Sequence, residues 1–291
     1  MDAVIGLGSA GVAIAQAFSK YPQYKIFKID TGLEEVGGAF ALEEQRTSED
    51  YEKNCPDMSQ YFSGFSEDTN VTFIMGGGGK IAGASLRILE QLKHTNLNIL
   101  YVTPDLSMMG GKKYFLNRIS YHVLQEYARS GMFKGMALLY NPSVEDLVGD
   151  VPVRGYFDIL NETTASTIHM INVFKNTEAV MQNLGDREEH HRIFTYGVVN
   201  PETNEEKMFF PLDNIKEKVY YIGINKSALD DGAYFKKLKK AMRERAEQED
   251  VKISFQINET KYDNPYAYFV AYSDEIQQEN NLKNYLTKSE E

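Results

Sequence analysis

Four consecutive glycines, Gly76, Gly77, Gly78 and Gly79, interrupt the chain between a β-rich run and a stretch with helical spacing. The run before them, residues 71–75, is almost continuously apolar, as in a strand buried on both faces. A turn with so many glycines costs conformational entropy when the chain folds. Such a turn is hard to explain unless the backbone there lies very close to another group. Phosphate groups held at the amino terminus of the next helix would explain it. A flexible hinge is the plain structural alternative.

A second glycine-rich turn lies near the start of the chain, at residues 6–11, with the sequence GLGSAG. It follows a short β-rich run and opens a helical stretch, as in dinucleotide-binding folds. In such a turn Gly8, Ser9 and Gly11 would bring the backbone close to a phosphate. Asp30 follows Gly8 by 22 residues and ends the next strand, where a ribose hydroxyl would be bound. A tight turn that only serves packing is the structural alternative.

The first 140 residues alternate between β-rich runs and helical stretches. This alternation predicts an α/β fold, in which a parallel sheet carries helices on both faces. The predicted strands cover residues 3–5, 24–29, 71–75, 97–103 and 134–140. The predicted helices cover residues 10–20, 81–94 and 112–130.

The pattern changes after Asn141-Pro142 and divides the chain into four predicted parts. Residues 1–150 form a Rossmann-like nucleotide-binding domain, and residues 151–184 form a long central helix. Residues 185–273 form a smaller α+β domain with strands at 219–224, 251–257 and 266–272 and a helix at 233–247. Within this domain, the polar and turn-rich stretch 200–206 predicts a loop or the tip of a hairpin. Residues 274–291 are expected to be a flexible tail.

Composition excludes several classes of protein. The chain has 31 Lys and Arg against 42 Asp and Glu, a formal charge of −11, so generic nucleic-acid binding is not expected. No apolar run approaches the ~20 residues of a membrane span, so we expect no membrane association through such a helix. We expect no signal peptide, because the first residues contain no basic segment. Cys55 is the only cysteine, which excludes an intrachain disulfide and favours a cytoplasmic protein.

Five segments, taken in order, resemble the tubulin and FtsZ family. The first glycine turn resembles its first nucleotide loop, and Asp30 falls on its second. The segment FIMGGGGKIAGAS resembles the tubulin signature, VTPDLSMMGGKKYF the stretch after the fourth strand, and LLYNPSVEDL the loop whose Asn contacts guanine. The family implies two domains joined by a central helix. A phage or plasmid type of member would fit the short chain.

The chain departs from the family pattern at positions that face the nucleotide in FtsZ. Each departure removes a hydrogen bond or a stacking surface, whereas backbone contacts to phosphate are less affected. In this chain, Ala13 replaces an Asn of the family pattern, and Lys80 and Ile81 replace a Gly and a Thr. Gly110 and Tyr114 replace a Glu and an Arg, and Leu160 replaces an aromatic residue.

The resemblance implies a guanine-nucleotide-binding protein that assembles head to tail with itself into filaments. GTP or GDP, with Mg²⁺ as an optional companion, would be held by Gly8, Ser9, Gly11, Asp30, Gly76, Gly77, Gly78, Gly79, Lys80, Asn141 and Asn161. In this family GTP hydrolysis is completed between subunits, by acidic residues on a loop after the central helix. Asp186, Glu188 and Glu189 are the candidates here, although their spacing is shifted by one residue. GTPase activity is therefore expected to be weak or lost.

Two other functions remain open. The altered positions favour a degenerate family member that acts as a structural or adaptor protein without GTPase activity. The first glycine turn with Asp30 also fits an NAD-dependent oxidoreductase.

Two clusters outside the motifs also attract notice. A run of six Lys and Arg within residues 236–245 could be a solvated helix face or the binding surface for a protein partner. No metal site is expected at His190-His191, because adjacent residues on a helix or strand point in different directions.

Overall fold

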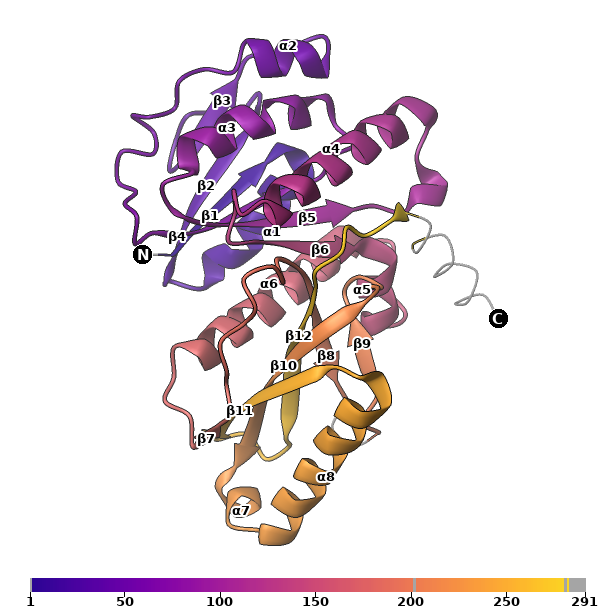
Figure 1. Ribbon diagram of the computed structural model, residues 1–291. Coiled ribbons are helices and arrows are strands. Elements are labelled where there is room, and N and C mark those ends of the chain that lie inside the picture. The colour runs from indigo at the N-terminus through magenta and orange to yellow at the C-terminus, as the bar shows by residue number, and fades with distance from the viewer. Residues whose placement is uncertain (1, 201–202, 280–281, 283–291) are drawn as a thin grey trace.

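The computed structural model describes residues 2–200, 203–279 and 282 (Figure 1). An amino-terminal half with a parallel sheet lies above a carboxy-terminal half, and the helix α6 (Tyr156–Lys175) crosses between them. The strands are β1 (Asp2–Leu7), β2 (Tyr24–Thr31), β3 (Ala39–Leu42), β4 (Asn70–Met75), β5 (Asn96–Thr103), β6 (Gly135–Tyr140), β7 (Met181–Gln182), β8 (Ile193–Val199), β9 (Glu206–Met208), β10 (Ile215–Asn225), β11 (Lys252–Thr260) and β12 (Tyr266–Ser273). The other helices are α1 (Gly8–Ala17), α2 (Ser48–Lys53), α3 (Ser85–Leu92), α4 (Gly111–Arg129), α5 (Asn141–Val148), α7 (Lys226–Leu229) and α8 (Gly232–Glu249), with short 3₁₀ segments at η1 (Phe18–Lys20), η2 (Lys80–Ala84) and η3 (Leu106–Met108).

The described strands form one continuous sheet in the order β3-β2-β1-β4-β5-β6-β8-β12-β10-β11-β7, and β9 pairs with β8. The first six strands in this order are parallel, as the alternating sequence pattern predicts. The two halves join through a short parallel contact between β6 and β8, in which Met136 pairs with Ile193 and Ala137 with Phe194. Beyond this junction the sheet is mixed, because β12 runs antiparallel to both β8 and β10.

Helices cover both faces of this sheet and create two apolar cores. One core lies under α3, α4 and α8 and includes Leu89, Leu124 and Met242. The other lies under α1, α5 and α6 and includes Ile14 and Ile168. In the parallel half, strands such as β1, β4 and β6 carry buried apolar residues on both faces, which explains why these strands show no polar alternation.

The central helix is shorter than the predicted central segment. It begins after Gly155, which has a left-handed φ of 78°, and ends at Lys175 rather than near residue 184. At its end, the side chain of Asn176 donates to the Asn172 carbonyl and the Thr177 hydroxyl donates to the Val173 carbonyl. These polar side chains satisfy carbonyl groups that another turn would have used, so the helix stops there. The chain then adds β7 to the edge of β11.

The segment expected to be a flexible tail is packed where the structure describes it. Gln277 is only 1% exposed, and its backbone N–H donates to Gln125 Oε1 on α4 at 2.8 Å. The Tyr114 hydroxyl donates to Glu279 at 2.7 Å, and Leu282 is fully buried. A polar composition did not reveal this contact, because the segment is held by buried hydrogen bonds more than by apolar side chains. Residues 280–281 and 283–291 of the expected tail lie outside the described part of the chain.

Sequence patterning did not predict several short elements. β3 and α2 lie in the connection between β2 and β4, and β8 follows the acidic loop. The Asn141-Pro142 pair was expected only to end the first pattern, yet it begins α5 with proline in the first turn. Proline is tolerated there, because the first helical N–H groups have no partner within the helix.

Candidate functional site

Three candidate segments leave the sheet at the same edge. Gly8 follows the last residue of β1, Gly76 follows the last residue of β4, and Asn141 follows the last residue of β6. Leu7 pairs with both Ile29 and Met75, so the turns after β1 and β4 begin at the same level. We call this side of the sheet the carboxyl edge.

The first turn owes its glycines to packing as well as to its shape. Gly8 has a φ of +69°, a conformation that side chains other than glycine rarely adopt. A Cβ on Gly6 would collide with the carbonyl of Gly11, and a Cβ on Gly11 would collide with the carbonyl of Ile74. These contacts draw the start of α1 against β4. Ser9 is exposed at the start of α1, where backbone N–H groups point toward solvent.

The second turn divides its four glycines between the core and the surface. Gly77 is buried, and its N–H bonds to the hydroxyl of Tyr101, whose pKa is raised chiefly by burial. A Cβ on Gly78 would lie 2.8 Å from the Met109 side chain. Gly79 and Lys80 are exposed. Only the second half of this turn is therefore open to a ligand from solvent.

The two glycine turns face each other across Ile81. A Cβ built on Gly8 would lie 2.9 Å from Ile81 Cγ2, and one on Gly79 would lie 3.7 Å from the same atom. At the position of Ile81, the family pattern that the motifs resemble has a Thr, whose side chain carries a hydroxyl. A methyl group therefore lies between the two turns where a hydrogen-bonding group is expected.

Several helical segments at the carboxyl edge begin without capping side chains. The helices α1, α4 and α5 and the η2 segment have no side-chain hydrogen bond at their N-cap and no acidic residue in their first turn. The helices α3 and α6 are uncapped as well, whereas the side chains of Thr47, Asp105, Asn225 and Asp231 cap α2, η3, α7 and α8. Uncapped amino termini leave free N–H groups and a positive dipole end, which together attract anions.

The remaining nucleotide candidates lie around these turns. Asp30 is near the end of β2, is half-buried, and accepts a hydrogen bond from the Thr31 N–H at 2.8 Å. Asn141 is half-buried at the start of α5. Asn161 is half-buried on α6, which contacts α5 through the bond from the Tyr156 hydroxyl to Glu145. The structure thus gathers Gly8, Ser9, Gly78, Gly79, Lys80 and Asn141 at one edge and places Asp30 and Asn161 on neighbouring elements.

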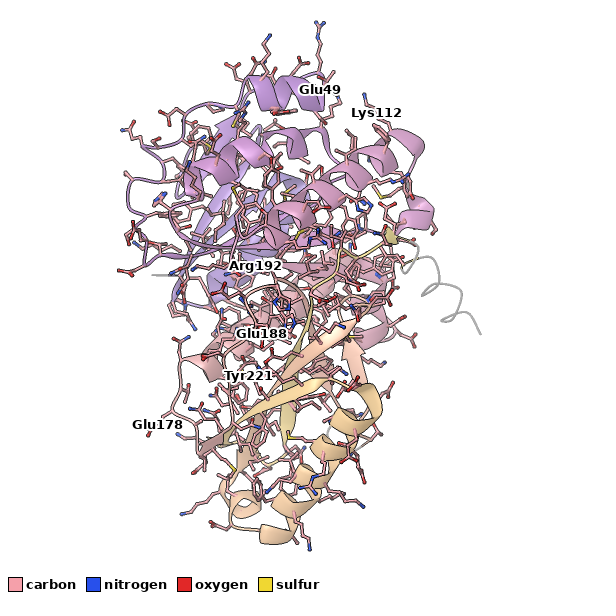
Figure 2. The ribbon with its side chains drawn as sticks, viewed as in Figure 1. Glu49, Lys112, Glu178, Glu188, Arg192 and Tyr221 are labelled. Atoms are coloured by element: carbon pink, nitrogen blue, oxygen red, sulfur yellow. The ribbon has the colours of Figure 1, made fainter. Side chains whose placement is uncertain are left out.

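The acidic candidates lie at the opposite edge of the sheet. Arg187, between Asp186 and Glu188, donates to the carbonyl of Lys134 at 3.3 Å, and Lys134 immediately precedes β6. Lys252 donates to the backbone carbonyl of Asp186 at 2.8 Å. The side chains of Asp186, Glu188 and Glu189 are all exposed. Figure 2 shows Glu188 near the junction of the two halves.

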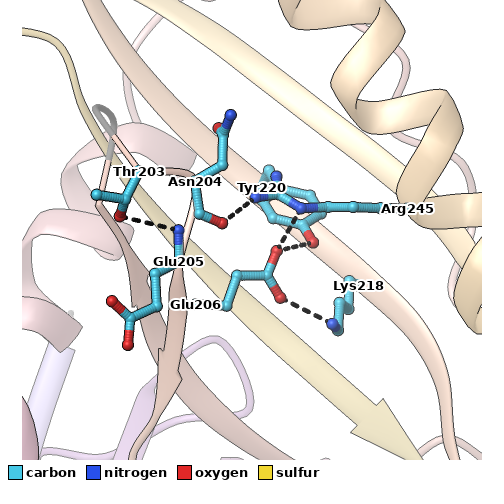
Figure 3. Close-up of polar contacts among 7 residues, drawn as sticks. All are labelled: Thr203, Asn204, Glu205, Glu206, Lys218, Tyr220 and Arg245. Atoms are coloured by element: carbon cyan, nitrogen blue, oxygen red, sulfur yellow. Dashed lines mark hydrogen bonds and ion pairs between the residues drawn. The ribbon is translucent and has the colours of Figure 1, made fainter.

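The basic helix separates into an outer and an inner part. Lys236, Lys237, Lys239, Lys240 and Arg243 are exposed on α8. Arg245 instead points inward, where its Nε lies 3.0 Å from Glu206 Oε1 and its Nη2 donates to the Asn204 carbonyl (Figure 3). Glu206 also accepts from the Tyr220 hydroxyl and lies 2.8 Å from Lys218 Nζ. Arg245 therefore anchors the β8–β9 hairpin to α8.

No helix among the described residues has the length and apolar character needed to cross a membrane.

Comparison with known proteins identifies the fold through structure alone. No protein-family model matches the chain, and no curated protein matches its sequence. A structure of CetZ from Methanosaeta thermophila superposes with a TM-score of 0.72 at 13% identity, covering 98% of this chain and 89% of the other. GDP-form protofilaments of TubZ from Bacillus thuringiensis give 0.72 at 12% identity, covering 99% and 92%. A GTPγS-bound protofilament of CetZ2 from Haloferax volcanii gives 0.68 at 13% identity, covering 99% and 97%. The chain has the fold of the tubulin/FtsZ superfamily, as the motif order predicts.

Proposed function

We propose that this protein binds a guanine nucleotide at the carboxyl edge of its parallel sheet and assembles head to tail into filaments. The observation that carries this proposal is the position of β6 between the two candidate clusters. Asn141 follows its last residue, and Arg187 of the acidic loop contacts the residue before its first. A six-residue strand is about 20 Å long, so one subunit cannot bring both clusters to one phosphate.

Head-to-tail stacking would place the two clusters together. The carboxyl edge of one subunit would face the acidic loop of the next, which is a heterologous contact that continues into a filament. The solved structures of similar fold include nucleotide-bound protofilaments of CetZ2 and TubZ, which supports this arrangement.

The residues present fit a bound phosphate better than a bound guanine. The Gly8 turn, the exposed Gly79 and the uncapped starts of α1, α4 and α5 offer backbone N–H groups. Lys80 is exposed beside them and adds a positive charge. For the base, Asn141 and Asn161 would offer polar contacts, while Leu160 is buried and offers no stacking ring.

We further propose that Asp186, Glu188 or Glu189 positions water for attack on the γ-phosphate of a neighbouring subunit. All three side chains are exposed, as a function between subunits requires. The loop has a defined path, because Lys252 donates to the Asp186 backbone carbonyl and the Arg187 side chain donates to the Lys134 carbonyl. The shifted spacing within this loop predicts slow hydrolysis.

The first test is to denature freshly purified protein, separate any released nucleotide by ion exchange, and repeat after incubation with GTP, with and without Mg²⁺. Near-stoichiometric guanine nucleotide, with sedimenting filaments when GTP is present, is the expected result. Absence of nucleotide before and after incubation would remove the nucleotide-binding proposal and leave a tubulin-fold scaffold. Recovery of NAD would instead support the oxidoreductase, which the fold comparison disfavours.

Mixing two variants tests hydrolysis between subunits. Asp186→Asn/Glu188→Gln/Glu189→Gln should bind GTP but not hydrolyse it. At a GTP concentration too low for its weakened affinity, Gly79→Asp should keep its acidic loop but leave its own nucleotide site empty. The acid variant supplies the nucleotide site, and the Gly79 variant supplies the acids. A mixture should therefore hydrolyse GTP although neither variant does so alone. Hydrolysis by the triple variant at the wild-type rate would exclude these acids.

A further inference from the structure

Two histidines and an aspartate meet where the acidic loop joins the sheet. One ring nitrogen each of His190 and His191 and one carboxylate oxygen of Asp274 all lie within 4.8 Å of one another. The antiparallel pairing of β8 with β12 brings them together, because Ile193 pairs with Ser273, the residue before Asp274. Residues more than 80 positions apart in the sequence therefore share one small volume.

The local backbone explains why adjacent histidines converge. They lie in a turn before β8, where the His191 N–H donates to the Glu188 carbonyl and the Arg192 N–H donates to the His190 carbonyl. The alternation expected of a helix or strand does not apply in such a turn. The two ring centroids are 4.6 Å apart, with an angle of 70° between the ring planes.

A buried carboxylate lies behind this cluster. Glu217 is 1% exposed, and its Oε2 lies 3.7 Å from His191 Nδ1, too far for a hydrogen bond. Neither of these two atoms has a hydrogen-bond partner among the described residues, although both are buried. The other Glu217 oxygen lies 3.4 Å from Lys252 Nζ. Burial of polar atoms without a partner is costly, which points to a positive group that completes the site.

We propose that His190, His191 and Asp274 bind a divalent transition-metal ion, Zn²⁺ being the best match. Two imidazole nitrogens and one carboxylate oxygen form a ligand set typical of zinc sites with one open position. Magnesium and calcium prefer oxygen ligands, so a set with two imidazoles disfavours them. Glu217 adds negative charge next to His191 and would stabilise the bound cation, as carboxylates behind metal-bound histidines do.

The geometry requires only a local adjustment. With bonds of about 2.1 Å, tetrahedral ligand atoms lie about 3.4 Å apart. His190 is exposed and Asp274 is half-buried, so these two side chains can move toward the more rigidly held His191. Among the described residues, Asp274 accepts one long hydrogen bond, from Asn214 at 3.3 Å. Positive groups on the neighbouring segments have other partners: Lys252 is directed at Glu217, Arg187 donates to the Lys134 carbonyl, and Arg192 donates to the Phe133 carbonyl.

The ion would fix the end of the acidic loop. His190 directly follows Glu189, and Asp274 directly follows β12. Metal binding would therefore tie the loop to the sheet of the carboxy-terminal half. This inference does not depend on nucleotide binding, since it rests on a different edge of the sheet.

The test uses the full chain without an affinity tag. Zn²⁺ binding is measured by competition with a chromophoric chelator, and Co²⁺ is used as a spectroscopic probe whose visible absorption reports a four-coordinate site. One equivalent of Zn²⁺ should bind, and His190→Gln and Asp274→Asn should each weaken binding at least 10-fold. His94→Gln, which removes an exposed histidine elsewhere, should bind like the wild type.

Two results would overturn the proposal. One is the absence of stoichiometric Zn²⁺ binding to folded wild-type protein. The other is wild-type affinity in His190→Gln, whose exposed position leaves the fold intact and whose circular dichroism confirms it.

Discussion

The hydroxyl of Tyr101 occupies the place where any side chain on Gly77 would have to lie. This hydroxyl bonds to the Gly77 N–H and donates to Asn117 on α4, where the carbonyl and Oδ1 are each 3.0 Å away. Tyr101 and Asn117 are fully buried. One glycine of the run therefore serves the core, by joining the turn to β5 and α4, and not a ligand.

Gly77→Ala should lower the free energy of unfolding by about 2–3 kcal/mol, because the new methyl group overpacks a buried site. Chemical denaturation measures this effect. Tyr101→Phe in the same chain should recover part of the loss, since it removes the colliding oxygen. Gly64→Ala is the matched control, because a Cβ there meets no atom within 4 Å. Equal stabilities for the two glycine variants would contradict the assignment.

Gly79→Asp should weaken phosphate binding without lowering the free energy of unfolding. Gly79 is exposed at the N-cap of η2, with φ −89° and ψ 150°, a conformation open to any residue. Aspartate is a favourable N-cap, so stability should stay equal or rise by about 0.5–1 kcal/mol. The same carboxylate would repel a phosphate, so nucleotide affinity should fall at least 10-fold.

Gly79→Ser is the neutral control for this substitution. It supplies a comparable cap without a charge and should retain most of the nucleotide affinity. Equilibrium dialysis with labelled GTP, together with denaturation of both variants, checks the prediction. An unchanged affinity in the aspartate variant would remove the η2 amino terminus from the site.

Sequence patterning was most informative where local rules decide the structure. Both glycine turns lie between a strand and a helix, as predicted, because tight turns and apolar runs have strong local signals. The motif order also indicated the tubulin/FtsZ fold, which the structural comparisons confirm.

Other features of the structure depend on tertiary contacts, which sequence patterning does not reveal. The glycine at 77 is explained only by Tyr101, which is distant in sequence. The meeting of Asp274 with His190 and His191 depends on strand pairing. The end of α6 at Lys175 was obscured because apolar residues resume a few positions later, at 179–181, where the chain enters β7. Whether the candidate site residues bind nucleotide stays a prediction.

His169 should make the protein less stable in mild acid. Its ring stacks on Tyr21 at 3.7 Å, and burial, with a smaller effect of Lys20, lowers its pKa. As the pH falls below the ordinary histidine pKa of about 6.5, the unfolded chain takes up a proton before the folded chain does. Stability is therefore lost progressively from there down to the folded pKa.

His169→Phe keeps the stacked ring but removes the titration. Its free energy of unfolding should fall less than that of the wild type between pH 8 and pH 5, measured by urea denaturation at each pH. His94→Gln, at an exposed position, should retain the wild-type dependence. A wild-type pH dependence in His169→Phe would show that this histidine does not titrate differently on folding.

Gln277→Ala should destabilise the protein although it lies in a polar carboxy-terminal segment. The Gln277 side chain accepts from the Asp213 N–H at 2.7 Å and donates to the Asp213 carbonyl at 3.2 Å. Truncation leaves these groups without their partner, so the free energy of unfolding should fall by about 2 kcal/mol. Gln278→Ala, at the exposed neighbouring position, should change it by less than about 0.5 kcal/mol. Thermal and urea denaturation of the two variants provide the comparison, and equal stabilities would mean that the segment is not held through Gln277.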